Sequence, residues 1–227
     1  MKGPTVSSVI PAFNAERFIG DAIASVLGGT LAPDEVIVVD DGSTDATADV
    51  VRSIPDRRIL LLQQPNAGFS SAVNRGVRES QGDVLTFCDA DDLWAPTRLE
   101  RQLELLGPLA PPAMVLGATK NFLDGEAPEA PSTQRIGIAP LRGAALMTRS
   151  AWNAVGPLDE TLRSQGTIEW WTRALAARVT VRRHEEIVLF RRIHGQNLGF
   201  TDRGVRDAEM PSVLRAHLAR KRASGPG

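Results

Sequence analysis

Three carboxylates stand within four positions of this chain, at Asp89, Asp91 and Asp92, directly after the apolar run of residues 84–87. Like charges this close repel one another, so such a cluster is typical of a place where a cation neutralises it. Hard divalent cations such as Mg²⁺ and Mn²⁺ bind carboxylate oxygens and keep coordination positions for phosphate. The spacing therefore predicts a metal site that holds a diphosphate. The alternative is a solvated loop in which Asp92 caps the helix that begins near Pro96.

Two other predicted strands also end in residues suited to binding. Residues 11–14, Pro-Ala-Phe-Asn, follow the strand predicted at 6–10, and residues 40–45, Asp-Asp-Gly-Ser-Thr-Asp, follow the strand predicted at 35–39. In open parallel sheets ligands bind beyond the carboxyl ends of the strands, so all three ends are expected at one edge. The chain has neither a G-x-G-x-x-G after the first strand nor a G-x-x-x-x-G-K-[ST], so a metal held by carboxylates would replace a glycine-rich phosphate loop.

Strands and helices alternate through the first hundred residues. Continuous apolar runs predict buried strands, and apolar residues at helical spacing predict the helices between them. The predicted strands are residues 6–10, 35–39, 59–62 and 84–87, and the predicted helices are residues 15–27, 45–52 and 70–79. This alternation predicts an α/β fold with a mostly parallel sheet flanked by helices.

The alternation stops after Leu106. Beyond it, the pattern predicts a polar loop at residues 124–132, strands at 141–148 and 186–193, and helices at 168–177 and 205–222. We expect one domain over residues 1–203, with a nucleotide-binding half at about 5–110 and an acceptor-side half at about 111–203. A basic helix and tail would follow at 204–227.

Composition and charge exclude several classes of protein. The chain has 227 residues, 42% of them hydrophobic and 23% charged, which is typical of a soluble globular protein. Its net charge of −1 gives no general attraction to nucleic acid. The single cysteine, Cys88, is expected in the core and suits a reducing, cytoplasmic compartment. No signal peptide is expected, and no apolar run approaches the roughly 20 residues that span a membrane.

The C-terminal segment of residues 203–222 carries six basic side chains against two acidic ones. Such a run usually forms a solvated helix face. The alternative is peripheral contact with an acidic partner or with the inner face of a membrane.

Four segments, taken in order, resemble the signature of family 2 glycosyltransferases with the GT-A fold. They are Val9-Ile10-Pro11-Ala12-Phe13-Asn14, Val39-Asp40-Asp41-Gly42-Ser43-Thr44-Asp45, Asn66-Ala67-Gly68 with Asn74-Arg75-Gly76, and Asp89-Ala90-Asp91-Asp92. The resemblance is dense over residues 5–100 and thin from there to about residue 200. It implies a GT-A-type sheet. It also implies transfer of a sugar, with inversion, from a nucleotide diphosphate-sugar to an acceptor hydroxyl, with a UDP-sugar as the favoured donor.

The resemblance further implies a set of donor-binding residues. They are Pro11, Ala12 and Asn14 lining the nucleotide pocket, Asp41 at the base or ribose, Gly68 passing close to the nucleotide, Asn74 supporting the pocket, Asp89 facing the ribose and sugar, and Asp91 on the metal. A Mn²⁺ or Mg²⁺ ion on Asp91 would bridge the diphosphate. Structural alternatives exist for three of them: Asn14 as a helix cap, Asp41 as a turn residue and Gly68 as a helix entry.

Inverting transfer needs a carboxylate that deprotonates the acceptor hydroxyl. The family usually supplies it from a Glu-Asp pair shortly before a helix, and in this chain Gly166 and Thr167 stand at that place. Glu169 is the nearest acid and is the predicted base; the alternative is a helix-face glutamate that pairs with Arg173. Asp159 is the other candidate.

A late R-x-H stretch also resembles the family. His194 would ligate the metal or touch the diphosphate. Arg191 and Arg192 would neutralise the leaving diphosphate, which a guanidinium group suits. Of the adjacent Trp170 and Trp171, at most one is expected to stack on a sugar, because adjacent helix positions face different ways.

Two other functions stay open. A nucleotidyltransferase has a similar sheet and makes a nucleotide-sugar, but the missing glycine-rich phosphate loop argues against it. A non-catalytic nucleotide-sugar-binding module is favoured by the missing Glu-Asp pair.

Overall fold

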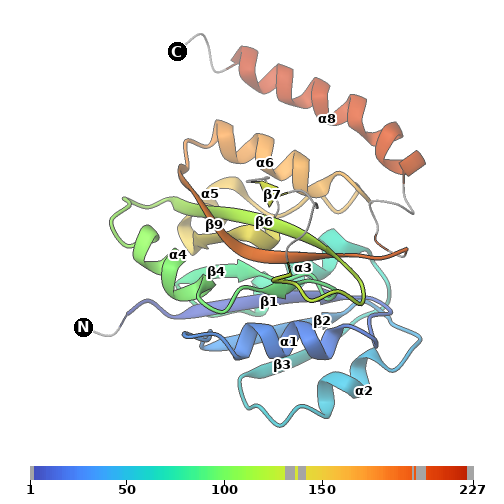
Figure 1. The fold of residues 1–227 in the computed structure, drawn as a ribbon. Helices are drawn as coiled ribbons and strands as arrows, with labels where there is room; N and C mark the ends of the chain where they lie inside the picture. The colour runs from blue at the N-terminus through green and yellow to red at the C-terminus, as the bar shows by residue number, and fades with distance from the viewer. Residues whose placement is uncertain (1–2, 131–135, 138–141, 196, 198–202, 224–227) are drawn as a thin grey trace.

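Figure 1 shows the computed structural model of the chain, which describes residues 3–130, 136–137, 142–195, 197 and 203–223. Within these residues one nine-stranded sheet has the strand order β3-β2-β1-β4-β8-β6-β9-β5, with β7 paired to β6. The strands are β1 (Val6–Ala12), β2 (Glu35–Asp40), β3 (Ile59–Gln63), β4 (Val84–Phe87), β5 (Leu93–Trp94), β6 (Ala113–Leu123), β7 (Ile136–Gly137), β8 (Ala145–Thr148) and β9 (Thr180–Ile193). The helices are α1 (Ile19–Leu27), α2 (Thr47–Arg52), α3 (Phe69–Glu79), α4 (Arg98–Leu106), α5 (Arg149–Val155), α6 (Gly166–Ala176) and α8 (Arg203–Ala223).

The first four strands of the chain pair in parallel, in the order β3-β2-β1-β4. Every residue of β1 and β4 is buried, because helices cover both faces of the sheet. Ile19 and Ile23 of α1 and Leu99 of α4 belong to the core on one face, whereas Val73 and Val77 of α3 belong to the core on the other. The predicted α/β fold is therefore confirmed.

The second part of the chain extends the same sheet. β8 pairs antiparallel with β4 and with β6, and β9 runs parallel to β6. β5 follows the acidic cluster and pairs with β9 at the far end of the sheet, so the acidic loop spans from β4 to β9. α8 lies outside α6 as the outermost helix in Figure 1. None of the described helices is long and apolar enough to cross a membrane.

Several parts of the second half differ from the sequence prediction; among them, β9 begins at Thr180 instead of residue 186. β6 was not predicted, because Gly117, Lys120 and Asn121 interrupt its apolar pattern. α5 was not predicted either. The strand predicted at 141–148 begins only at Ala145, since Arg142–Ala144 form a 3₁₀ helix, and residue 141 lies outside the described residues. Residues 131–132 of the predicted loop also lie outside them, and the division of the chain at residue 203 stays a prediction.

Candidate active site

The loops after β1 and β2 meet at the carboxyl edge of the parallel strands. Asn14 adopts a left-handed backbone with φ 48°. Its Oδ1 accepts a hydrogen bond from the Thr44 N–H at 2.8 Å, and its own N–H donates to Ser43 Oγ at 2.9 Å. Pro11 and Ala12 lie within β1 and are buried beside β2. Asn14 therefore joins the two loops instead of capping α1, and the nucleotide contacts of all three residues stay predictions.

Asp41 holds the loop that leads into α3. It is buried, and its Oδ1 accepts hydrogen bonds from Gln64 Nε2 at 2.7 Å and from the Ala67 N–H at 2.9 Å. Its Oδ2 accepts from the Gly68 N–H at 2.8 Å. Gly68 has φ 91°, a conformation that side chains disfavour, and it immediately precedes α3. The structure thus brings the predicted residues Asp41 and Gly68 together, with Asp41 shaping the loop at the predicted nucleotide site.

Asn74 connects α3 to the loop before α6. Its Nδ2 donates to the Leu158 carbonyl at 2.9 Å and to Glu160 Oε1 at 2.8 Å, and its Oδ1 accepts from the Leu158 N–H at 2.8 Å. The side chain is buried, so these bonds use it fully within the protein. The support of the nucleotide pocket by Asn74 stays a prediction.

Asp92 is the buried member of the acidic loop. Burial raises the pKa of its carboxyl well above the ordinary value, and the neighbouring charges of Asp91 and Asp89 raise it further. Its Oδ1 accepts the Arg192 backbone N–H at 3.0 Å, which ties the loop to β9. The helix that follows starts at Arg98, and Asp92 does not cap it. The alternative of a solvated capping loop is therefore wrong for Asp92.

Asp91 and His194 form a pair at the carboxyl edge. His194 Nε2 lies 2.9 Å from Asp91 Oδ2, and the imidazole packs against the Phe18 ring with centroids 4.7 Å apart. Asp91 keeps a quarter of its side chain exposed (25%), which leaves the carboxylate accessible from solvent. The two residues predicted as metal ligands are therefore neighbours, although 103 positions separate them in the sequence. Asp89, half-buried, lies in the same loop.

The two arginines of β9 have different surroundings. Arg192 donates from Nη1 to Asp124 Oδ1 at 3.0 Å and from Nη2 to Asp21 Oδ2 at 3.3 Å, and its side chain is only 10% exposed. The guanidinium is thus paired with two carboxylates, and the role of Arg192 at a leaving diphosphate stays a prediction. Arg191 is half-buried and makes no ion pair with any residue that the structure describes, which leaves its charge for a ligand.

Glu169 lies in the first turn of α6 and is engaged by two arginines. Both carboxylate oxygens accept from Arg173 Nε, at 3.1 and 2.9 Å, and Arg220 Nη2 of α8 lies 3.3 Å from Oε1. Glu169 therefore makes the helix-face pair with Arg173 that was the structural alternative to a catalytic role. The other candidate, Asp159, accepts from the N–H and Oγ1 of Thr161, and these hydrogen bonds lower the pKa of its carboxyl. The assignment of Glu169 as base stays a prediction.

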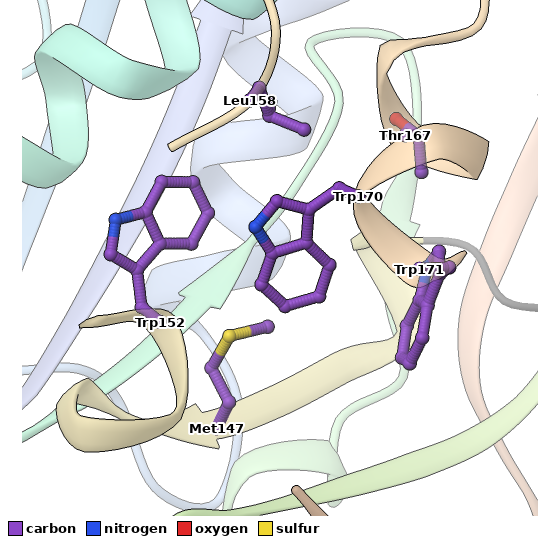
Figure 2. A pocket seen from close by; sticks show the side chains of 6 residues that line it. All are labelled: Met147, Trp152, Leu158, Thr167, Trp170 and Trp171. Atoms are coloured by element: carbon purple, nitrogen blue, oxygen red, sulfur yellow. The ribbon is translucent and has the colours of Figure 1, made fainter. Parts of the chain in front are cut away.

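Trp170 and Trp171 both belong to the core. Trp170 stacks on Trp152 with ring centroids 5.6 Å apart, and its Nε1 donates to the Gly156 carbonyl at 2.8 Å. Trp171 meets Trp170 edge-on, with an angle of 88° between the rings. Figure 2 shows that these rings surround a cavity of about 10 Å³, whose lining residues are Met147, Trp152, Leu158, Thr167, Trp170 and Trp171. Both rings are buried, which agrees with the prediction that at most one of them stacks on a sugar, and neither offers a face to one.

α8 contributes a carboxylate to the start of α6, which sequence reasoning missed. Glu209 Oε1 accepts the Arg163 N–H at 2.8 Å, and its Oε2 accepts the N–H groups of Ser164 at 3.1 Å and Gln165 at 3.0 Å. An acidic group is stabilised at this end of a helix, where unpaired N–H groups concentrate. No local pattern around Glu209 signals a partner more than forty positions earlier in the chain.

Comparison with known proteins identifies the family of this chain. Residues 7–157 match the family described as Glycosyl transferase family 2. An uncharacterized glycosyltransferase of Haemophilus influenzae is 38% identical over 109 residues, which are 47% of this chain and 44% of that protein. This chain therefore spans less than half the length of that relative.

Solved structures share the fold. S. aureus TarS 1-349 in complex with UDP-GlcNAc gives a TM-score of 0.72 at 17% identity, over 95% of this chain and 66% of that chain. The mannosyltransferase PcManGT from Pyrobaculum calidifontis, in complex with GDP-Man and Mn²⁺, gives 0.68 at 19% identity, over 100% of this chain and 66% of that chain. The predicted GT-A-type fold is thereby confirmed. Because the family match also covers more than half of the residues, this chain belongs to glycosyl transferase family 2, a family of enzymes of glycosyl transfer.

Proposed function

We propose that this chain transfers a sugar from a nucleotide diphosphate-sugar, with a UDP-sugar favoured, to an acceptor hydroxyl, and that the transfer inverts the anomeric carbon. The observation that carries the proposal is the pair of Asp91 and His194, 2.9 Å apart at the carboxyl edge of the parallel strands. Arg191 lies in β9, three residues before His194, and supplies a positive charge suited to a diphosphate. Membership of the family supports the same chemistry.

The residues at this edge fit a divalent cation that takes most of its ligands from substrate and water. Among the described residues, no three His, Cys, Asp or Glu side chains form a complete metal-binding group. Mg²⁺ and Mn²⁺ commonly use one or two carboxylates together with substrate phosphates, so a full protein cage is not required. Asp91 and His194 would hold the ion. When bound, it would stabilise the negative charge that develops on the departing diphosphate.

The identity of the donor class is supported by the fold neighbours. TarS was solved with UDP-GlcNAc, and PcManGT with GDP-Man and Mn²⁺. Both ligands are nucleotide diphosphate-sugars, which is the chemistry that a cation beside Asp91 and the guanidinium of Arg191 would recognise. We therefore propose Mn²⁺ or Mg²⁺ as the cofactor, and Asp89 as a residue that faces the ribose and sugar.

Glu169 is the proposed base. The start of α6 lies beside the start of α3, because a Cβ on Gly166 would come within 2.5 Å of Ser70 Oγ. α3 begins at the carboxyl edge, which supports placing the first turn of α6 on the acceptor side of the site. The ion pairs with Arg173 and Arg220 favour the ionised form of Glu169, the form that a base requires.

Calorimetric titration of UDP in the presence of Mn²⁺ tests the donor site. Asp91→Asn removes a charged ligand while it keeps the shape of the side chain. Loss of a group that only hydrogen-bonds a metal ligand typically lowers metal affinity at least about tenfold, so loss of a ligand charge should lower Mn²⁺-dependent UDP binding by at least that much. The control is Asp49→Asn, on the exposed surface of α2. UDP affinity in Mn²⁺ that is equal in Asp91→Asn and the parent would overturn the metal assignment.

A non-catalytic nucleotide-sugar-binding module is the second candidate, and the two arginines on Glu169 favour it. It predicts binding of a UDP-sugar without release of UDP or free sugar. A nucleotidyltransferase would instead form a nucleotide-sugar from a sugar phosphate and a nucleoside triphosphate. Product analysis with both sets of substrates separates the three functions.

We also propose peripheral contact of α8 with the cytoplasmic face of an anionic membrane. Leu214 and Leu218 lie one turn apart and are both about half exposed (52% and 51%), and the exposed Arg215 and Arg222 accompany them. An apolar stripe with basic neighbours is suited to an anionic lipid surface. Co-sedimentation with phosphatidylglycerol vesicles should fail for the doubly substituted Leu214→Ser, Leu218→Ser protein.

A further inference from the structure

Asn197, four residues after the end of β9, is a residue to which no role was predicted. It is buried, and its backbone N–H donates to the His194 carbonyl at 3.4 Å. Its side-chain Oδ1 accepts the His194 N–H at 2.7 Å. The same amide donates from Nδ2 to Asp91 Oδ2 at 3.1 Å and to the Arg192 carbonyl at 3.1 Å. One side chain therefore contacts both proposed metal ligands.

The orientation of this amide is fixed by its surroundings. Nδ2 faces two acceptors, at Asp91 and Arg192, and Oδ1 faces one donor, at His194. Rotating the amide by half a turn would place its oxygen against two acceptors and its N–H₂ group against a donor. Asn197 consequently offers Asp91 a hydrogen bond of constant direction, and an amide does not titrate.

The side chains of His194 and Asn197 both contact Oδ2 of Asp91. Only Asn197 can keep its hydrogen bond if His194 binds a cation through Nε2. In this structure His194 Nε2 is 2.9 Å from Oδ2, and an ionised carboxylate only accepts, so Nε2 must carry the proton to hydrogen-bond ionised Asp91. A metal-bound imidazole nitrogen must be unprotonated, so His194 cannot ligate through Nε2 and donate from it at the same time. The amide of Asn197 has no such conflict.

We propose that Asn197 is a positioning residue for the cation site: its amide keeps Asp91 Oδ2 in place once His194 turns to the metal, so that Oδ1 faces the ion. This inference rests on the proposed function. Oδ1 of Asp91 accepts no hydrogen bond from any described residue, which leaves it for a ligand. Removal of a side chain that orients a metal ligand typically lowers the affinity for the metal.

Electron paramagnetic resonance of free Mn²⁺, with the metal alone and then with UDP, measures the affinity directly. Asn197→Ala should weaken Mn²⁺ binding about 10- to 100-fold. The matched control is Asn153→Ala, on the exposed side of α5, which should leave it unchanged. Thermal unfolding of each variant monitors the fold. If Asn197→Ala does not fold, Asn197→Gln supplies the test, since it keeps a buried amide but displaces the donor by one methylene and should also weaken Mn²⁺ binding.

A second background separates positioning from a general structural effect. In Asp91→Asn there is no carboxylate to orient, so Asn197→Ala should change the residual Mn²⁺ affinity by less than about twofold, a non-additive result. An equal loss in both backgrounds would overturn the inference. So would parent-like Mn²⁺ affinity in Asn197→Ala while Asp91→Asn is weakened. If Asp91→Asn itself binds Mn²⁺ as the parent does, the metal assignment fails and the inference fails with it.

Discussion

Among single residues, Asp41 holds together the loop between β3 and α3. Its carboxylate accepts two backbone N–H groups, from Ala67 and Gly68, besides the Gln64 amide. Asp41→Ala leaves those buried donors without their charged acceptor, so the free energy of unfolding should fall by about 1.5–3 kcal/mol. UDP affinity should fall as well, because the released loop forms part of the proposed nucleotide site.

Urea denaturation and UDP titration measure these two effects. Asp49→Ala, an exposed acid of α2, is the control and should shift stability by no more than about 0.5 kcal/mol. A stable Asp41→Ala protein with parent-like UDP affinity would remove Asp41 from the site.

A second prediction for a single residue concerns Glu169, the proposed base. Glu169→Gln keeps the shape of the side chain and an oxygen for Arg173, but it cannot accept a proton. Turnover should fall at least about a hundredfold, the lower end of what a general base contributes, while UDP binding persists. Glu104→Gln, an exposed acid of α4, is the control. Transfer at the parent rate would move the search for the base to Asp159.

Among the elements, α8 depends on a few polar contacts with α6. Glu209 binds three N–H groups at one end of the contact, and Arg220 bonds Thr172 Oγ1 at 2.6 Å and Glu169 at the other. Glu209→Ala should therefore cost about 1.5–3 kcal/mol of docking free energy. Hydrogen exchange across residues 203–223 should accelerate, because a helix held by fewer contacts opens more often.

Arg215→Ala is the control for this element, since Arg215 is exposed. Unchanged exchange in Glu209→Ala would mean that apolar contacts such as that of the buried Val213 dock the helix without the carboxylate.

The same elements mark how far sequence reasoning reaches. The four parallel strands and their helices were predicted because each apolar run lies in one continuous segment. β6 escaped because its burial comes from neighbours β8 and β9, and Gly117 and Lys120 hide the pattern. The Asp91–His194 pair was reachable through the family resemblance. The ion pairs of Arg192 could not be predicted, because its partners Asp21 and Asp124 lie far away in the sequence.

At the scale of the whole molecule, Asn74 of α3 connects the first part of the chain to the loop around Leu158. Its side chain hydrogen-bonds both the N–H and the carbonyl of Leu158, which lies in the second part of the chain. Asn74→Ala leaves them unpaired in the interior, so the free energy of unfolding should fall by about 1–3 kcal/mol. Urea unfolding followed by two probes should still give one coincident transition, since one sheet runs through both halves.

Asn153→Ala again serves as the exposed control. Two separated transitions in Asn74→Ala would show that the halves unfold independently, contrary to the continuous sheet.

The place of β8 in that sheet has a consequence for synthesis on the ribosome. β4 lies between β1 and β8, yet β8 is made only when translation has reached Thr148. Until then the nascent chain presents β4 with an unpaired edge, the kind of edge that attracts other strands. The segment that carries most of the proposed donor-binding residues is thus translated before β8, but its sheet is completed only when β8 has been made. Nascent chains that stop short of residue 148 should need a chaperone on that edge, and protection from protease should appear only after β8 has left the exit tunnel.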